Sequence, residues 1–199
     1  MTEVPFVGLT GGVGSGKSTA LDVLERLGAS TLSTDAVVHD LYASDEVRDA
    51  VVERFGPAVA RDGAVDRAAL AERAFATPED RAWLEGLLWP RVGKRIAAWR
   101  AEQLERDPPP VALVVEVPLL FEAGMEGAFD ATVAVVAHEA VRAQRAAGRG
   151  HEAVDERVAR QLPQDEKATR ADHAVFNDGS IEDLERNLSS VVGMLTAAG

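Results

Sequence analysis

The stretch Gly8-Leu-Thr-Gly-Gly-Val-Gly-Ser-Gly-Lys-Ser-Thr19 decides the fold class of this chain. Within it, Gly11, Gly16, Lys17 and Ser18 complete the pattern G-x-x-x-x-G-K-[ST], in which a glycine-rich turn surrounds phosphate groups. The glycines let successive backbone N–H groups turn inward toward an anion, and the lysine adds a positive charge. The stretch therefore predicts a phosphate-binding loop.

The residues on either side of the loop support this prediction. Val4–Leu9 is an apolar run of strand length, and after the loop apolar residues recur at helical spacing up to Leu27, just before Gly28. A strand, a glycine loop and a helix in this order are the context that the motif requires. The residues expected to bind the nucleotide here are Gly12, Val13, Gly14, Ser15, Gly16, Lys17, Ser18 and Thr19.

Length and composition predict a single domain that works inside the cell. The 199 residues carry 21 Lys and Arg against 33 Asp and Glu, and the formal net charge of −12 argues against a general affinity for nucleic acid or acidic membranes. There is no cysteine, hence no disulfide framework, and no apolar run has the length of a membrane span. We expect a cytoplasmic protein without a signal sequence.

The order of apolar patterns predicts a doubly wound α/β fold, with a parallel sheet flanked by helices. The expected strands are Val4–Leu9, Ala29–Leu32, Val111–Val117, Thr132–Ala137 and Ala174–Phe176. The expected helices are Ser18–Leu27, Glu46–Phe55, Ala68–Phe75, Pro78–Leu88, Val92–Leu104, Glu139–Ala147, Ala153–Leu162 and Ile181–Leu195. Within one domain over residues 1–199, residues 43–107 show helical patterns and no convincing strand, which predicts a helical insertion that binds the second substrate.

Two carboxylates and one hydroxyl are candidates for the reaction itself. Asp35 follows the expected second strand, where it can accept a proton from an attacking hydroxyl or hold a water on Mg²⁺; the alternative is a helix N-cap for Ala36–Tyr42. Glu116 ends the most apolar strand, where a carboxylate can position Mg²⁺, or it is an ordinary strand-end carboxylate. Ser18 of the loop is the expected hydroxyl ligand of Mg²⁺.

Two basic groups complete the candidates. One follows helical spacing near an expected lid at about residues 139–163, and guanidinium groups there would neutralise charge on a phosphoryl group; the alternative is a solvated basic face. The second, in the helical insertion, would hold an acidic part of the acceptor. The groups are Arg142, Arg145 and Arg149, and Arg91, Lys94 and Arg95.

Taken together, these residues resemble the dephospho-coenzyme A kinase family, and the resemblance runs nearly from end to end. It rests on Thr10-Gly11-Gly12 in the loop, Asp35 after Leu27-Gly28-Ala29, Leu87-Leu88-Trp89-Pro90, Val117-Pro118-Leu119-Leu120-Phe121-Glu122, Arg145 with Arg149, Gln161, Lys167, Ala171-Asp172 and Asn177. The resemblance implies a P-loop kinase that transfers the γ-phosphate of ATP to the ribose 3′-hydroxyl of dephospho-coenzyme A, with Mg²⁺, in the last step of coenzyme A synthesis.

The resemblance also implies roles for individual residues. Asp35 resembles the family's general base, Arg145 and Arg149 resemble lid arginines, and Asn177 resembles a residue near the adenine of ATP. Together with Lys17 on the phosphates, Asp35 and Arg145 would carry the transfer.

Two positions depart from the family pattern. The family usually has Asp-Ala-Asp where this chain has Ser33-Thr34-Asp35, so a base role falls on Asp35 alone. It usually has histidine before proline where Trp89 stands, and an indole can stack or donate one hydrogen bond but cannot exchange a proton at neutral pH.

Two other functions share the same loop. A small-molecule or nucleoside monophosphate kinase would combine the loop with a different acceptor, and a P-loop ATPase or switch would hydrolyse ATP slowly without one. The guanine-reading pattern Asn-Lys-x-Asp does not occur in the chain, which argues against a guanine-specific switch. The sequence leaves the oligomeric state open.

Overall fold

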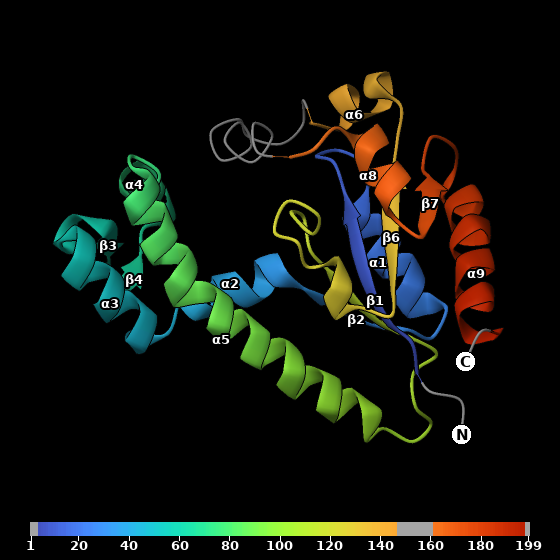
Figure 1. Cartoon of the computed structure of the whole chain (residues 1–199), viewed down its shortest axis with the longest axis horizontal. Coiled ribbons are helices and arrows are strands. Elements are labelled where there is room, and N and C mark those ends of the chain that lie inside the picture. Colours follow the sequence, from blue (N-terminus) through green and yellow to red (C-terminus); the bar gives the residue numbers. More distant parts are fainter. Residues whose placement is uncertain (1–3, 147–160, 198–199) are drawn as a thin grey trace. The chain divides into compact units, whose positions relative to one another are not determined.

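A computed structural model describes residues 4–146 and 161–197 of the chain. These residues form two compact units (Figure 1). The first, which we call the sheet unit, combines Met1–Ser33 with Arg100–Gly199, and the second, the helical unit, is Thr34–Trp99. The helical insertion was predicted over residues 43–107, and the compact unit starts and ends earlier in the chain.

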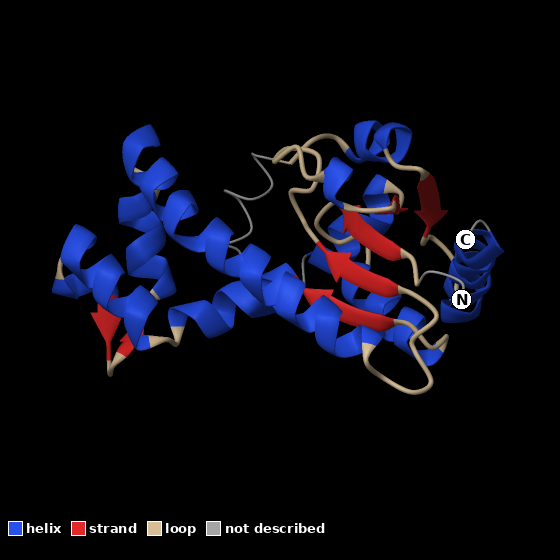
Figure 2. Ribbon diagram, turned by 60° about the horizontal axis from the view of Figure 1, so that its bottom comes forward, coloured by secondary structure: helices blue, strands red, loops and turns tan. Residues whose placement is uncertain are grey.

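The sheet unit is built on five parallel strands, which Figure 2 shows in red. They are β1 (Phe6–Gly11), β2 (Ser30–Ser33), β5 (Leu113–Glu116), β6 (Ala131–Val136) and β7 (His173–Phe176), in the spatial order β2-β5-β1-β6-β7. From β1 the chain continues to β2 on one side, and from β6 it continues to β7 on the other. In α/β proteins, ligands bind outside the carboxyl ends of the strands at such a switch point. The predicted doubly wound α/β fold is confirmed.

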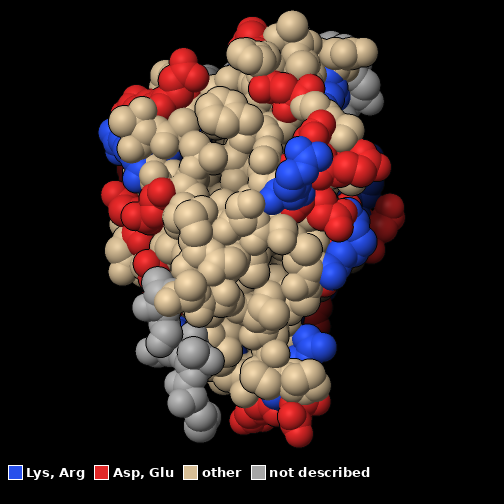
Figure 3. All heavy atoms as spheres, turned by 90° about the vertical axis from the view of Figure 1, so that its right-hand side faces the viewer, with Lys and Arg blue, Asp and Glu red and all other residues tan. Residues whose placement is uncertain are grey.

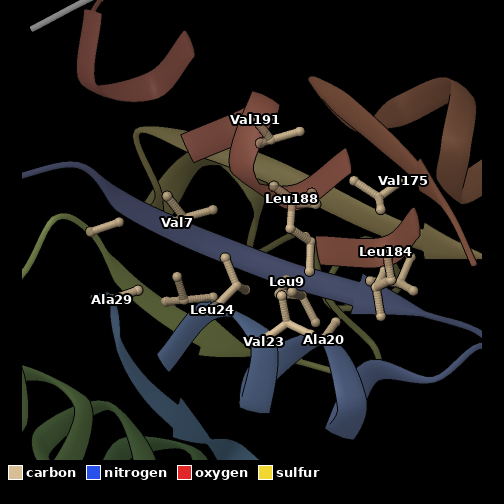
Figure 4. Packing of buried hydrophobic residues seen from close by; sticks show 14 residues of the cluster. Val7, Leu9, Ala20, Val23, Leu24, Ala29, Val175, Leu184, Leu188 and Val191 are labelled. Carbon is tan, nitrogen blue, oxygen red and sulfur yellow. The ribbon is translucent and has the colours of Figure 1, made fainter. Parts of the chain in front are cut away.

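Helices cover both faces of this sheet. They are α1 (Lys17–Arg26) and α9 (Ile181–Ala197) on one face and α8 (Gln164–Arg170) on the other, and a further helix, α6 (Glu139–Ala146), lies beside the loop that follows β1. On one face, Val7 and Leu9 of β1 pack with Val23 and Leu24 of α1 and with Leu188 of α9 (Figure 4). This buried cluster fixes α1, and with it the loop that precedes α1, against the central strand. Of the predicted helices in this unit, Ala153–Leu162 lies largely outside the described residues, and α8 was not predicted.

Phe6 and Gly8 of β1 point to the face of the sheet opposite Val7 and Leu9, because successive residues of a strand alternate between its two faces. Phe6 lies with its ring centroid 4.9 Å from that of Phe129, and the Arg100 guanidinium lies 4.5 Å from the Phe6 ring centroid. A Cβ atom on Gly8 would come within 2.6 Å of the Leu120 side chain. The segment after β5, to which Leu120 belongs, therefore packs directly on β1.

The helical unit has its own apolar core. Its elements are α2 (Thr34–Tyr42), α3 (Asp45–Phe55), the short 3-10 helix Pro57–Val59, β3 (Ala60–Arg61), β4 (Ala64–Val65), α4 (Arg67–Ala74) and α5 (Pro78–Leu104), which continues past the end of the unit. Val47, Val51 and Leu70 are among the buried side chains. The interpretation that this segment lacks strands was wrong, because β3 and β4 pair across Asp62 and Gly63, whose φ angles of 51° and 80° suit a tight hairpin turn.

Helix α5 corrects a second prediction. The sequence predicts two helices on either side of Pro90, but the structure has one helix of 27 residues with this proline inside it. Leu84, Leu88 and Val92 are all buried on one stripe of α5 that crosses the proline. Burying three such side chains contributes about 1.5–3 kcal/mol each, which offsets the roughly 3 kcal/mol that a proline costs inside a helix.

Residues other than Lys, Arg, Asp and Glu cover most of the face shown in Figure 3. Figure 3 looks onto the side where α9 lies, and there acidic and basic side chains gather at the margins. Phe176 and Ile181, at the end of β7 and the start of α9, are large apolar side chains with more than half of their surface exposed, at 62% and 56%.

Within residues 4–146 and 161–197, none of the helices has the length and apolar character that a membrane crossing requires.

Candidate active site

The loop between β1 and α1 has a backbone that only glycine fits. Gly14 and Gly16 have φ angles of 77° and 92°, in the left-handed region that other residues avoid. A Cβ atom on Gly14 would lie 2.7 Å from the Arg142 backbone oxygen, and one on Gly16 would lie 2.1 Å from Asn177 Nδ2. The loop is therefore closely enclosed by α6 and by the residue after β7.

The start of α1 suits an anion. Gly16 is the N-cap and brings no side chain to the N–H groups of the first turn, and that turn holds no acidic residue. Such an N-terminus carries a partial positive charge and N–H donors that bind phosphate well. Ser18 lies in this turn and is exposed. The glycine-lined cradle and its donors fit a phosphate group.

Lys17 places its ammonium at this loop. Its Nζ donates hydrogen bonds to the carbonyl oxygens of Gly11 at 3.1 Å and of Gly12 at 3.3 Å. The same nitrogen is 4.0 Å from Glu116 Oε1, and both side chains are nearly buried, at 12% and 10% exposure. The structure thus brings together the lysine and the strand-end carboxylate that the sequence proposed separately.

Ser33 joins this pair, and the sequence did not predict it. Its hydroxyl donates a 2.7 Å hydrogen bond to Glu116 Oε2. The two residues are register partners at the ends of the neighbouring strands β2 and β5. The only available signal was the departure from the family pattern at this position. Among the residues described, no group of three or more His, Cys, Asp or Glu side chains forms a ready metal site.

Asp35 lies in the helical unit, two residues after β2 ends. It occupies the first turn of α2, which begins at Thr34, and its side chain is half-buried. An N-cap residue would precede the helix, so the alternative interpretation as the cap of Ala36–Tyr42 was wrong. Its role as a base stays a prediction.

The α6 arginines meet the loop in two ways. Arg145 Nη1 donates to the Asn177 backbone oxygen at 3.1 Å, and Asn177 Nδ2 donates to the Ser15 backbone oxygen at 2.8 Å. Asn177 is buried, so its amide holds the loop backbone in place. Arg142 Nε donates to the Val13 carbonyl oxygen at 2.9 Å, a contact that the sequence did not predict. Arg149 lies outside the described residues, as does much of the expected lid.

The second basic group, Arg91, Lys94 and Arg95, lies on α5 in the helical unit. Arg91 pairs with Glu46 and donates to the Leu87 carbonyl oxygen at 2.7 Å. Lys94 and Arg95 are exposed on the same helix. The Trp89 side chain is 38% exposed. Two exposed cations and one accessible indole are therefore present on α5, and they suit a ligand with both charged and aromatic parts.

A parallel sheet with a phosphate loop after its central strand, a lysine over that loop and a carboxylate beside it define the class of P-loop kinases. A sequence model of the family described as dephospho-CoA kinase (CoaE) matches residues 5–183. The dephospho-CoA kinase of Symbiobacterium thermophilum is 41% identical over 183 residues, which cover 89% of this chain and 75% of that protein. This chain belongs to the dephospho-CoA kinase family.

Solved structures share the fold of this chain. The crystal structure of TT1252 from Thermus thermophilus matches with a TM-score of 0.79 and 35% identity, covering 97% of this chain and 99% of that one. The dephospho-CoA kinase from Campylobacter jejuni matches with a TM-score of 0.60, covering 96% and 97% of the two chains; at 21% identity this likeness supports the fold alone.

Proposed function

We propose that this protein transfers the γ-phosphoryl group of ATP to the ribose 3′-hydroxyl of dephospho-CoA, giving CoA and ADP. One observation carries the proposal: a member of this family keeps an enclosed glycine loop with the Lys17 ammonium and the Glu116 carboxylate together at its edge. The substrates are then ATP and dephospho-CoA rather than nucleic acid or a membrane, and the absence of cysteine suits the cytoplasm.

The loop would hold the phosphates of ATP. Backbone N–H groups between Gly12 and Ser18 would supply donors along the loop, and Thr19 would extend them into the first turn of α1. Two of the groups in this range, those of Val13 and Ser15, donate to Gln161 Oε1 and to the Gly12 carbonyl oxygen in the structure. Lys17 would exchange its present carbonyl partners for the β- and γ-phosphates. Asn177, at the loop backbone, would line the nucleotide side of the site.

Ser18 and Glu116 are the residues that would hold Mg²⁺. The exposed Ser18 hydroxyl and the Glu116 carboxylate supply the oxygen donors that Mg²⁺ prefers, and two such donors are typical because substrate phosphates and water complete its shell. When bound, Mg²⁺ would neutralise negative charge on the β- and γ-phosphates. Ser33 holds Glu116 Oε2, which fixes the direction of the carboxylate.

The transfer would proceed in line. Asp35 accepts the proton of the 3′-hydroxyl, the 3′-oxygen forms a bond to the γ-phosphorus, and the bond from that phosphorus to the β–γ bridging oxygen breaks as ADP leaves. Arg145 and Arg149, from the proposed lid at about 139–163, neutralise charge on the transferred group. The balance is one phosphoryl group gained by the acceptor and one proton taken by the carboxylate.

The acceptor would be recognised by the helical insertion over residues 43–107. Lys94 and Arg95 are exposed cations that suit the phosphates of dephospho-CoA, with Arg91 beside them on α5. Trp89 offers an aromatic face on which a base can stack. This part of the proposal treats the whole chain as one kinase domain.

The deciding experiment measures ADP release from MgATP with dephospho-CoA, with adenosine monophosphate and with no acceptor, and identifies the product by mass. A phosphate added only to dephospho-CoA is the expected result. Transfer to adenosine monophosphate would show another small-molecule kinase, and acceptor-independent hydrolysis would show an ATPase or switch.

Variants then test the two central roles. Asp35→Asn should lower kcat by about 10²–10⁴-fold, the usual loss of a general base. Asp40→Asn, an exposed carboxylate on the same helix, is the matched control and should change kcat by less than about 3-fold. Lys17→Ala should abolish most ATP turnover. A fully active Asp35→Asn enzyme would remove Asp35 from the mechanism.

A further inference from the structure

Both polar backbone atoms of Val13 are held by side chains from outside the phosphate loop. Gln161 Oε1 accepts a hydrogen bond from the Val13 N–H, with an N···O distance of 3.2 Å. Arg142 Nε donates to the Val13 carbonyl oxygen at 2.9 Å. Val13 stands between Gly12 and Gly14, residues with little conformational preference of their own. These two side chains therefore hold the peptide planes on both sides of Val13. In the plane before Val13 the Gly12 carbonyl oxygen also accepts from the Ser15 N–H at 3.2 Å and from Lys17 Nζ at 3.3 Å.

The segment that carries Gln161 is anchored in turn. The next residue, Leu162, donates its backbone N–H to Glu122 Oε1 at 2.7 Å. The same carboxylate oxygen lies 2.8 Å from Lys167 Nζ. Lys167 is fully buried and also donates to the Pro118 carbonyl oxygen at 2.7 Å and to Thr10 Oγ1 at 3.3 Å. One buried cation thus joins α8, the end of β1 and the segment after β5.

Stability alone is a poor explanation for this ion pair. Taking both charges out of water is costly, and a buried ion pair is often no more stabilising than apolar side chains of similar volume. Burial lowers the pKa of Lys167 below the ordinary lysine value, and the hydrogen bond and charge of Glu122 oppose that shift. What the pair provides that an apolar pair would not is a fixed acceptor for the Leu162 N–H.

We propose that Gln161 is a positioning residue of the phosphate loop, which holds Val13 in the orientation that nucleotide binding needs, and that Glu122 and Lys167 hold Gln161 in place. The N–H groups that would face the phosphates follow Val13 along the loop, so their direction depends on this peptide plane. A loop that is ordered before binding loses less entropy when the ligand arrives. The proposal rests on the proposed function only in requiring that the loop binds MgATP.

The first test is Gln161→Met, which keeps the side-chain length and removes the acceptor. Two quantities are measured: the exchange rate of the Val13 amide hydrogen by NMR, and the Kd of MgATP by calorimetry. We expect faster exchange at Val13 and a Kd raised about 2–10-fold, the range for one lost hydrogen bond. This variant disturbs no buried charge, so it decides the question even if a core variant fails to fold.

The second test compares two double variants. Glu122→Gln with Lys167→Met removes both charges and keeps an acceptor for the Leu162 N–H, whereas Glu122→Leu with Lys167→Met removes that acceptor too. We expect the first pair to keep the Kd of MgATP within about 2-fold and the second to raise it about 2–10-fold. A purely structural ion pair would affect both double variants alike.

The control is Glu166→Gln with Arg170→Met, which removes an exposed ion pair from the same helix α8. It should leave the Kd of MgATP and the Val13 exchange rate unchanged. Unchanged values in Gln161→Met, or equal values in the two double variants, would overturn the proposal. A wild-type protein that fails to bind MgATP would instead overturn the proposed function, so the two failures are distinguishable.

Discussion

Gly16 and Gly28 form a matched pair at the two ends of α1, and they separate backbone strain from crowding at the loop. Their φ angles are 92° and 91°, so alanine meets the same conformational penalty at both sites. The surroundings differ. A Cβ atom on Gly16 would lie 2.1 Å from Asn177 Nδ2, whereas one on Gly28 would meet a Val111 methyl at 3.4 Å, an ordinary contact. We predict that Gly16→Ala is far more damaging than Gly28→Ala.

The magnitudes follow from the contacts. An alanine in the left-handed region costs about 1–2 kcal/mol, and the reduced entropy of the unfolded chain returns about 0.4–1 kcal/mol, so Gly28→Ala should cost about 1 kcal/mol. At Gly16 the Asn177 amide must also move, which breaks its buried 2.8 Å bond to the Ser15 oxygen. An unsatisfied buried polar group adds about 1–3 kcal/mol, so Gly16→Ala should cost about 2–4 kcal/mol in total.

Stability is measured by urea unfolding, with hydrogen exchange of the β1 and α1 peptides as the signal. Tryptophan fluorescence is unsuitable here, because Trp83, Trp89 and Trp99 all belong to the helical unit and would report on that unit. The Kd of MgATP is measured on the same variants, and we expect it to rise at least about 10-fold in Gly16→Ala and to stay within about 2-fold in Gly28→Ala. In an Asn177→Ala background, Gly16→Ala should cost only about as much as Gly28→Ala. Equal costs of the two glycine variants in the wild-type background would refute the reasoning.

Three further predictions concern other contacts. Ser33→Ala removes the donor to Glu116 Oε2, and we expect a higher Mg²⁺ concentration for half-maximal activity with little change in melting temperature; an unchanged Mg²⁺ titration would exclude a role for the hydroxyl. Thr132→Val removes the 2.8 Å hydrogen bond from the Thr132 hydroxyl, which is the main cause of the lowered pKa of Asp172, so it should lower the free energy of unfolding by about 1 kcal/mol near pH 7. A carboxylate with a lowered pKa stabilises the fold above its unfolded pKa of about 3.9, so the stability difference between wild type and variant should shrink as the pH falls through the folded pKa. A stability difference that does not change with pH would contradict this prediction. Pro90→Ala restores a donor inside α5 and should raise the unfolding free energy of the helical unit by about 1–3 kcal/mol, measured by tryptophan fluorescence; a loss of stability would show that the proline is well accommodated.

Local patterns were enough for most of the sheet unit. Each apolar run predicted as a strand overlaps a strand of the structure. The signal is clearest for β1, β5 and β6, whose residues are all buried, because a strand covered on both faces of a parallel sheet is a nearly continuous apolar run. The phosphate loop is equally local, since its glycines, lysine and serine lie within one turn of chain. The α5 helix shows where this reasoning fails: proline opposes a helix locally, and only the packing of Leu84, Leu88 and Val92 overrides it.

The sequence by itself determined the nucleotide loop, the α/β class and the family, because those depend on residue types at short, fixed spacings. Only the tertiary structure decided which distant side chains complete the site. Ser33 meets Glu116 across 83 positions of the sequence, and Gln161 meets Val13 across 148. These residues meet because the fold of the parallel sheet brings together, at one edge, segments that are far apart in the sequence. No periodicity encodes such pairings, since strand order and register arise from the packing of the whole sheet.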